Sequence, residues 1–496
     1  MSQTQTHLQA PGEKQFFGHP RGLATLFFTE MWERFSYYGL RGLLVLFLTA
    51  ALADGGFAFA DSTAGAILGL YTASVYLLSL PGGWIADRIL GQRSAVFWGG
   101  VVIAAGHFTM ALGSKVLFFV GLCLVAVGTG LLKPNVSAIV GELYSDRGAR
   151  RDAGFSIFYM GINLGAFLGP IICGYLGENI NWHLGFGAAG VGMLAGLIQY
   201  RMGDAYLKEA GLLQEDALDK RSGAIRALIA GVAVVTVITV LLWLLNRAGT
   251  VNVTIEAIAG GAGVTIVSIA VLYFAYLMAM GGLAADEKKR VTYIFILFIG
   301  AAMFWAGFEQ AASTLNLFAE RLTDRTIGSW EMPTSWLQSV NALFIILLAP
   351  VVGSLWVRLD ERNPSIPVKF GWGLVLLGVG FFVLAWGASF ATPENPVSPM
   401  WLVVTYFFHT VGELALSPVG LSSVTKLAPH RLVGQMMGVW FMGTSLGNLI
   451  AGMAAGQLES LSPPTLFTTV GAIAAGAGLV YFVFHRPIKH LGPDVK

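Results

Sequence analysis

The chain has 496 residues, of which 55% are hydrophobic and only 12% are Asp, Glu, Lys or Arg. An average soluble domain carries roughly twice this charged fraction, so this chain could not cover its surface with polar groups in water. The 30 basic and 28 acidic residues leave a net charge of +2, which indicates no charged partner such as a nucleic acid. The composition excludes a soluble multidomain enzyme and a disordered chain, and it predicts a polytopic membrane protein.

Long apolar runs recur along the whole sequence. A bilayer core about 30 Å thick needs roughly 20 apolar residues for each spanning helix. The first run is too long and too rich in charge to be a cleavable signal peptide, so we expect it to remain as a span. The apolar runs predict fourteen membrane helices, at residues 22–52, 63–86, 94–113, 116–141, 153–176, 182–200, 225–246, 255–281, 291–319, 335–357, 368–388, 399–425, 433–457 and 464–484.

The basic residues between these helices indicate the orientation of the chain. If the N-terminus is cytoplasmic, twenty-three of the 30 Lys and Arg residues lie in cytoplasmic segments. The external segments then hold only Lys115, Arg247, Arg321 and Arg325. Because positive charge is enriched on the cytoplasmic side of membrane proteins, we expect both termini to be cytoplasmic.

Polar connections divide the predicted helices into groups of six, two and six. A long polar segment at 201–226 and a basic cluster at 286–290 flank the seventh and eighth helices, which carry almost no charge. We therefore expect an all-α protein with an N-terminal six-helix bundle at 1–200 and a C-terminal six-helix bundle at 290–496. Between them, residues 201–289 would form a cytoplasmic linker and an inserted two-helix hairpin that faces lipid at the periphery.

A few charged residues fall inside the predicted spans. A charge at the bilayer centre costs from about 3 to over 10 kcal/mol, so such residues normally face a polar interior. The intramembrane cations are Arg34, Arg41 and Lys133, and the intramembrane carboxylates are Glu30, Glu33, Glu309 and Glu413. Together they sum to minus one if all are ionised, which predicts that at least one glutamate takes up a proton during function. A proton is therefore the coupling ion that we expect.

The first predicted helix carries most of these charges on one face. Its charged and tyrosine residues fall within an arc of about 140° and extend over about 16 Å of the helix axis. A structural ion-pair cluster between helices is an alternative explanation. We favour a lined pathway, because Lys133, Glu309 and Glu413 in other helices also lie near mid-membrane, where transporters bind their substrates.

Several motifs resemble those of the proton-dependent oligopeptide transporter family, which belongs to the major facilitator superfamily. They occur in family order in both halves of the chain. The matching segments are Glu30 to Gly39 (EMWERFSYYG), Gly83 to Arg93, Lys133 to Asn135, Phe158 to Gly165 (FYMGINLG), Phe304 to Gln310, Gln338 to Asn341 and Gly412 to Pro418. The resemblance implies the major facilitator fold with fourteen transmembrane helices, as in bacterial members. Ala342 stands where a proline usually follows the asparagine, so we expect a change in affinity rather than a loss of transport.

The resemblance also implies how a peptide is bound. A di- or tripeptide is a zwitterion, and in the family its carboxylate meets cations of the N-terminal half, here Arg34 and Lys133 with Arg41 nearby. Its amine meets the carboxylate that Glu413 matches, with help from Asn163. The remaining expected binding residues are the second amide, a hydroxyl and the aromatic walls, namely Asn341, Ser417, Tyr37, Tyr38, Tyr71, Trp305 and Trp440.

For proton coupling, we expect two groups of carboxylates to act. Glu30 and Glu33 would exchange protons while they pair with Arg34. Glu309 would alternate between a bound proton and a salt bridge to Arg41 or Lys133. These residues are thus the expected coupling set.

The sequence predicts a proton-coupled symporter of di- and tripeptides in the bacterial inner membrane, acting as a monomer without metal, other cofactor or catalytic residue. A carrier of the same fold for a small anion such as nitrate is the nearest alternative, and Glu413 opposes it by repelling an anion. A peptide-gated receptor without transport is a further alternative. An intramembrane enzyme is disfavoured, because the G-x-S-x-G match at Gly443 to Gly447 lies inside an apolar span.

Overall fold

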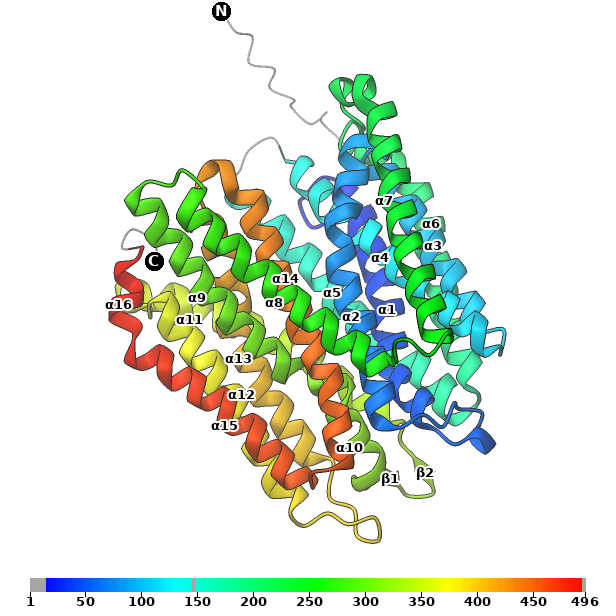
Figure 1. The fold of residues 1–496 in the computed structure, drawn as a ribbon. Helices are drawn as coiled ribbons and strands as arrows, with labels where there is room; N and C mark the ends of the chain where they lie inside the picture. The colour runs from blue at the N-terminus through cyan, green and yellow to red at the C-terminus, as the bar shows by residue number, and fades with distance from the viewer. Residues whose placement is uncertain (1–14, 145–147, 493–496) are drawn as a thin grey trace, which may run out of the picture. The chain divides into compact units, whose positions relative to one another are not determined.

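The computed structural model describes residues 15–144 and 148–492, and helices dominate this part of the chain (Figure 1). Fourteen of its sixteen α-helices have 19 or more residues, enough to span a bilayer core, and ten of them are also strongly apolar. The helices are α1 (Gly22–Thr49), α2 (Asp61–Ile85), α3 (Gln92–Met110), α4 (Lys115–Glu142), α5 (Ala149–Asn179), α6 (Trp182–Gly203), α7 (Glu215–Arg247), α8 (Ile255–Met280), α9 (Ala285–Phe308), α10 (Thr314–Leu322), α11 (Ser339–Leu359), α12 (Ile366–Ala388), α13 (Met400–Leu427), α14 (Val433–Met453), α15 (Pro463–Val483) and α16 (His485–His490).

The ninth predicted span is broken, which corrects the expectation of one continuous helix over 291–319. Helix α9 ends at Phe308, a 3-10 turn follows at Glu309–Ala312, and α10 resumes at Thr314. At the break, the buried Ser313 hydroxyl donates to the Ala451 carbonyl of α14 at 2.6 Å. Such side-chain hydrogen bonds compete with the regular hydrogen bonding of a helix. The break therefore places the Glu309 backbone and side chain where a helix has lost its regular hydrogen bonding.

Two further boundaries differ from the sequence expectation. Helix α7 begins at Glu215, ten residues before the predicted start, because the segment that precedes the apolar run is rich in helix-forming residues. A two-stranded antiparallel hairpin, β1 (Thr326–Ile327) and β2 (Trp330–Glu331), stands between α10 and α11, where no strand was expected. Gly328 in its turn has a φ of +66°, which L side chains rarely adopt.

The contacts among its residues divide the chain into two compact units. Unit 1 comprises Met1–Tyr38, Leu78–Gly169 and Phe186–Leu241, and unit 2 comprises Gly39–Leu77, Pro170–Gly185 and Leu242–Lys496. The borders cross α1, α2, α5, α6 and α7. The second part of α1 and the first part of α2 therefore belong to the same unit as the C-terminal helices. The six-helix bundles at 1–200 and 290–496 stay a prediction, because this division follows different lines.

A large apolar core holds the helices of unit 2 together. Its fully buried side chains include Phe304, Phe370 and Phe381, contributed by α9 and α12. Helix α12 packs along both α13 and α15, and α9 packs along α14. Burial of aromatic side chains of this size makes a large contribution to the stability of the helix packing.

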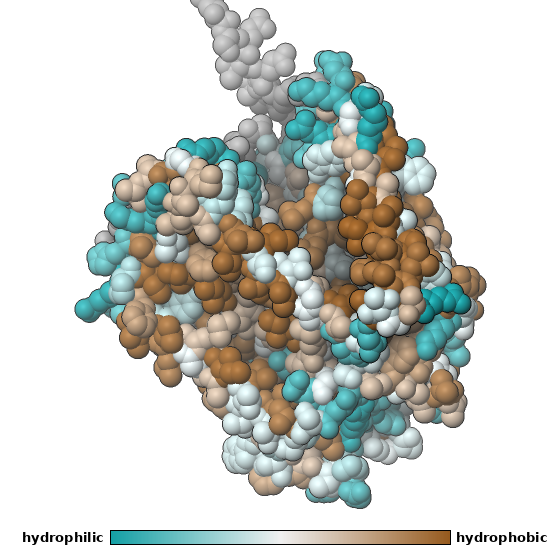
Figure 2. All heavy atoms as spheres, viewed as in Figure 1, coloured by the Kyte–Doolittle hydropathy of each residue, from teal (hydrophilic) through white to brown (hydrophobic). Residues whose placement is uncertain are grey.

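The inserted helices α7 and α8 differ in their surroundings. The apolar segment of α7 is fully exposed, as expected for a helix that faces lipid, and Figure 2 shows hydrophobic side chains over it. Helix α8 is not simply peripheral, which corrects the expectation for the pair. Ala259 and Ile266 of α8 pack in one cluster with Ala66 of α2 and Leu446 of α14, and the Glu256 carboxylate accepts a hydrogen bond from Thr63.

Candidate functional site

The first group of predicted site residues lies on α1 within unit 1. Arg34 Nε is 3.0 Å from Glu30 and 2.5 Å from Glu33, and all three side chains are buried. One of these contacts joins residues four apart, which a helix brings together on one face. The Arg34 guanidinium also lies 5.2 Å from the ring centre of Tyr37, within the range of a cation–π contact. The local sequence of α1 is thus sufficient to assemble this cluster.

Helix α5 packs closely against the charged part of α1. A Cβ atom at Gly165 would lie 2.2 Å from the Met31 carbonyl oxygen, so only glycine permits this approach. Asn163, two residues earlier, is buried and donates to the Tyr159 carbonyl at 2.9 Å. Gly165, the last residue of the FYMGINLG segment, therefore has a direct packing role beside the Glu30–Glu33–Arg34 cluster.

Lys133 and Tyr38 complete the set that unit 1 supplies. Lys133 lies in the second half of α4 and is half-buried. Tyr38 is half-buried on α1, and its ring lies edge-on to that of Tyr37, with 5.2 Å between the ring centres. Unit 1 thus supplies two cations, two carboxylates, two tyrosines and one amide of the predicted site.

The second group lies in unit 2, where Arg41 and Glu309 form a buried ion pair. The two residues are 5% and 7% exposed. Arg41 Nη2 contacts the Glu309 carboxylate and also donates to the Glu309 carbonyl at 3.3 Å. Asn316 of α10 adds a second polar link, because its amide donates to the Gly42 carbonyl at 2.9 Å. The break between α9 and α10 is therefore joined to α1 at two points.

A buried ion pair of this kind has a specific energetic character. Its mutual attraction is largely cancelled by the cost of removing both charges from water, so the intact pair adds little net stability. Removing one partner's charge leaves the other buried and uncompensated, which costs several kcal/mol. The Arg41–Glu309 pair is thus poised to respond to a change in the charge of Glu309.

Glu413 lies in the same unit, on α13, and accepts a hydrogen bond from Asn341. The Asn341 amide donates to Glu413 at 3.2 Å and to the Thr410 hydroxyl at 2.9 Å. Helix α9, which ends at the residue before Glu309, packs along α13. Unit 2 therefore holds the predicted amine-binding group and the predicted coupling carboxylate together.

The aromatic residues predicted for unit 2 are placed unequally. Trp440 is buried, and its ring lies against α13, where a Cβ atom at Gly420 would come within 2.1 Å of it. Tyr71 is buried on α2, whereas Trp305 and Ser417 are half-buried. Trp440 thus has an evident packing role, and its part in peptide binding stays a prediction.

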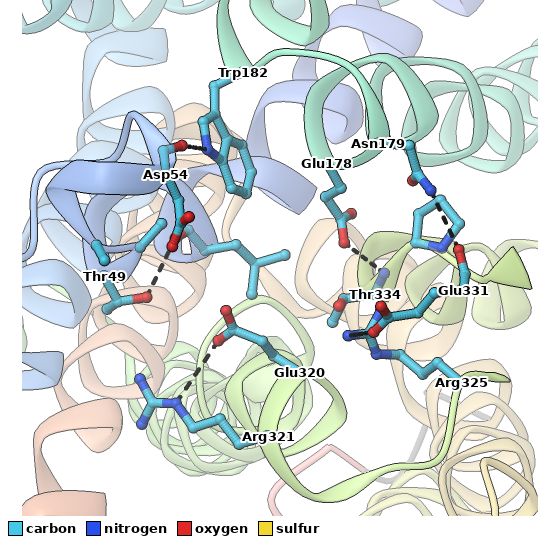
Figure 3. Close-up of a pocket in the computed structure, with 14 residues that line it drawn as sticks. Thr49, Asp54, Glu178, Asn179, Trp182, Glu320, Arg321, Arg325, Glu331 and Thr334 are labelled. Carbon is cyan, nitrogen blue, oxygen red and sulfur yellow. Dashed lines mark hydrogen bonds and ion pairs between the residues drawn. The ribbon is translucent and has the colours of Figure 1, made fainter.

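Sequence reasoning missed a charged cavity of about 550 Å³ in unit 2 (Figure 3). Glu178 at the end of α5 accepts hydrogen bonds from the Thr334 and Ser335 backbone N–H groups at 2.6 and 3.0 Å and from the Ser335 hydroxyl at 2.6 Å. Arg321 donates to both carboxylate oxygens of Asp61 at 2.7 and 2.8 Å. Glu178 and Arg321 lie at helix ends, and no sequence pattern indicates their distant partners.

Within residues 15–144 and 148–492, no group of three His, Cys, Asp or Glu side chains is arranged to hold a metal ion. The serine of the G-x-S-x-G match, Ser445, lies inside α14 and donates to the Ala73 carbonyl at 3.0 Å. The Ser445 hydroxyl therefore donates its proton to a backbone carbonyl and not to a side chain that could act as a general base.

The sequence model of the POT family matches residues 93–467. The chain belongs to the POT family. It is 43% identical to the peptide transporter YePEPT of Yersinia enterocolitica, and the match covers 98% of each chain. It is 36% identical to the di-/tripeptide transporter of Lactococcus lactis subsp. cremoris, over 98% of this chain and 99% of that one.

Solved structures of family members agree with this assignment. A crystal structure of a peptide transporter POT in complex with sulfate is 42% identical, covers 97% of both chains and superposes with a TM-score of 0.88. A POT family transporter in complex with 5-aminolevulinic acid is 35% identical, covers 96% of this chain and 98% of that one, and gives a TM-score of 0.87. This POT family member is therefore a multi-pass membrane transporter of the major facilitator fold and not an enzyme, as the sequence predicts.

Proposed function

We propose that this POT family member is a proton-coupled symporter of di- and tripeptides that works as a monomer by alternating access in the bacterial inner membrane, with both termini cytoplasmic. Its relatives include a peptide transporter and a di-/tripeptide transporter that each match over nearly the whole chain. The observation that carries the proposal is the buried Arg41–Glu309 ion pair, which lies in the same unit as Glu413.

The proposed peptide site follows from the charges of the substrate. The peptide ammonium would bind Glu413 and Asn341 in unit 2, since a buried carboxylate attracts an amine and repels an anion. The peptide carboxylate would bind the cations Arg34 and Lys133. Tyr37, Tyr38, Tyr71, Trp305 and Trp440 would form adaptable walls, with Asn163 and Ser417 as further polar contacts.

Proton coupling would act through the ion pairs. Protonation of Glu309 would leave Arg41 as an uncompensated buried cation, which is costly until an anion such as the peptide carboxylate meets it. Proton and peptide would then favour the same conformation, which is the requirement for coupling. Glu30 and Glu33 would exchange the second set of protons against Arg34, and the proton is the only cofactor proposed.

The test is uptake of a labelled dipeptide into proteoliposomes with an imposed inward proton gradient, with and without a protonophore. We expect gradient-dependent accumulation that the protonophore abolishes. The variant Glu309→Gln should lose accumulation but retain exchange of external for internal peptide, because exchange needs no net proton movement. Glu394→Gln, an exposed glutamate between α12 and α13, is the matched control and should behave as the wild type.

Two results would contradict the proposal. Absence of gradient-dependent uptake by the wild type would refute the symporter function as a whole. Accumulation against a gradient by Glu309→Gln would refute the coupling role of this residue while leaving peptide transport intact.

A further inference from the structure

Thr410 of α13, which neither the sequence motifs nor the ion pairs single out, contacts the amide of Asn341. The Asn341 Nδ2 atom donates to Thr410 Oγ1 at 2.9 Å and to Glu413 Oε2 at 3.2 Å. Thr410 is fully buried, Glu413 is 8% exposed, and Asn341 is half-buried. A single amide group is therefore shared between a hydroxyl and a carboxylate one turn of α13 apart.

The hydrogen-bonding capacity of Thr410 determines which way this amide faces. Its hydroxyl has one proton, and it donates that proton to the Tyr406 carbonyl at 2.7 Å. Thr410 Oγ1 can then only accept, so it requires the nitrogen of the Asn341 amide and not the oxygen. An ionised Glu413 is also an acceptor only and makes the same demand.

The opposite face of the amide is left as an acceptor. Both N–H bonds of Asn341 are directed to Thr410 and Glu413, so its Oδ1 atom points away from them. Among the described residues, no donor reaches Asn341 Oδ1, and none reaches the second carboxylate oxygen, Glu413 Oε1. Two acceptors of the predicted amine site thus keep free lone pairs, which suits an ammonium group with three N–H donors.

The reversed amide would be a competitor of this arrangement. With Oδ1 toward Thr410 and Glu413, two hydrogen bonds would be lost and oxygen would face oxygen, which is unfavourable because buried polar groups would be left unsatisfied. If Glu413 took up a proton it could donate to Oδ1 and favour the reversed amide. Thr410 opposes that reversal in either protonation state of Glu413, because its own proton stays on the Tyr406 carbonyl.

From this geometry we infer that Thr410 is a positioning residue for amine recognition, which fixes the Asn341 amide so that Oδ1 is presented to the substrate ammonium. The inference rests on the proposed function, in which a peptide amine binds at Glu413. It assigns a specificity role to a residue that does not itself contact the peptide. The role depends on the Thr410 hydroxyl and not on its methyl group.

The test compares two competitors of labelled dialanine uptake in proteoliposomes. One is unlabelled dialanine, and the other is N-propanoyl-alanine, which is dialanine with the ammonium replaced by hydrogen. Amine recognition is measured as the half-inhibitory concentration of N-propanoyl-alanine divided by that of dialanine. We expect Thr410→Val to lower this ratio about tenfold, since a hydrogen bond to a charged group is worth about 1.5–3 kcal/mol. Thr410→Ser keeps the hydroxyl and should preserve the ratio.

A second threonine of the same helix is a matched control. Thr405 is fully buried on α13, and its hydroxyl donates only to the Trp401 and Gly380 carbonyls, at 2.8 and 3.1 Å. Thr405→Val removes a buried hydroxyl without touching the Asn341 amide, so it should leave the ratio unchanged. Thr410→Ala repeats the test with a smaller side chain if Thr410→Val does not fold.

The outcomes separate this inference from the proposed function. If the wild type neither takes up dialanine nor discriminates the two competitors, the proposed function itself fails. If the wild type discriminates and Thr410→Val keeps its ratio, or weakens both competitors equally, the positioning role is overturned. A ratio lowered in Thr410→Ser as much as in Thr410→Val would also overturn it, because the hydroxyl would then be irrelevant.

Discussion

The contact of α2 with α14 allows a sharp test, because the two helices meet through glycine backbone. A Cβ atom at Gly452 would lie 2.4 Å from the Gly69 Cα and 2.5 Å from the Gly65 carbonyl oxygen. A Cβ at Gly65 would in turn lie 2.2 Å from the Gly452 carbonyl oxygen. The variant Gly452→Ala therefore places a methyl group where backbone atoms, which cannot rotate away, already stand.

The size of the effect follows from these distances. Ordinary van der Waals contact begins at 3.4 Å, so the two helices would have to separate by about 1 Å to admit the methyl group. Overpacking of this kind typically costs about 1–3 kcal/mol. If α2 and α14 separate during transport, that cost shifts the equilibrium toward the separated state by about 5- to 150-fold.

The assay is a distance measurement between spin labels attached at Ala60, just before α2, and Ile450 of α14, which are both exposed. Cys123 is exposed and has to be replaced by serine first. We expect a second, longer distance in Gly452→Ala. Gly476→Ala in α15 is the matched control, because a Cβ there meets nothing within 4 Å.

A clear result would refute this reasoning. If Gly452→Ala gives the same distance distribution as Gly476→Ala, the glycine contact does not hold α2 and α14 together. If Gly452→Ala alone fails to fold, the contact between α2 and α14 is required for folding as well as for holding these two helices together.

Two further predictions concern the polar contacts around the cavity. Glu178→Ala removes the acceptor of three hydrogen bonds at the start of the segment that leads into α11, so we expect the free energy of unfolding to fall by about 2 kcal/mol. Its melting temperature should be lower than that of the control Glu331→Ala, which removes an exposed carboxylate. Equal melting temperatures of the two variants would contradict this prediction. Asp61 and Arg321 should show a coupling energy of about 0.5–1 kcal/mol in a double-mutant cycle, because Arg321 is partly exposed and solvent screens the pair. That coupling should fall as salt is added, and a coupling that does not depend on salt would show that the pair is shielded from solvent.

The features that depend on local sequence could be predicted. Apolar runs of sufficient length gave fourteen spans, and the spacing of Glu30, Glu33 and Arg34 put them on one face of α1, where they pair. Such contacts join residues within one or two turns, so helical periodicity alone brings them together. Their roles in transport stay predictions.

The features that depend on distant partners could not be derived in this way. The ends of α9 and α10 are determined by contacts such as that of Ser313 with Ala451, and apolar periodicity contains no information about such a partner. The role inferred for Thr410 depends on Asn341, which lies on another helix, and on a proton donated within its own helix. Glu309 was expected to pair with either Arg41 or Lys133, and only the structure distinguishes Arg41 as the partner.

In the described part of the chain, five helices cross the borders of the two units, and α1, α2 and α5 cross at or within one turn of a proline or glycine. Helix α5 passes from unit 1 to unit 2 between Gly169 and Pro170, and Pro170 has no N–H to bond the preceding turn. Helix α2 crosses between Leu77 and Leu78, within one turn of Pro81, and α1 crosses at Gly39. These helices are continuous rods that bend most easily where they change neighbours. The chain can therefore bend locally at these three crossings while each helix stays continuous.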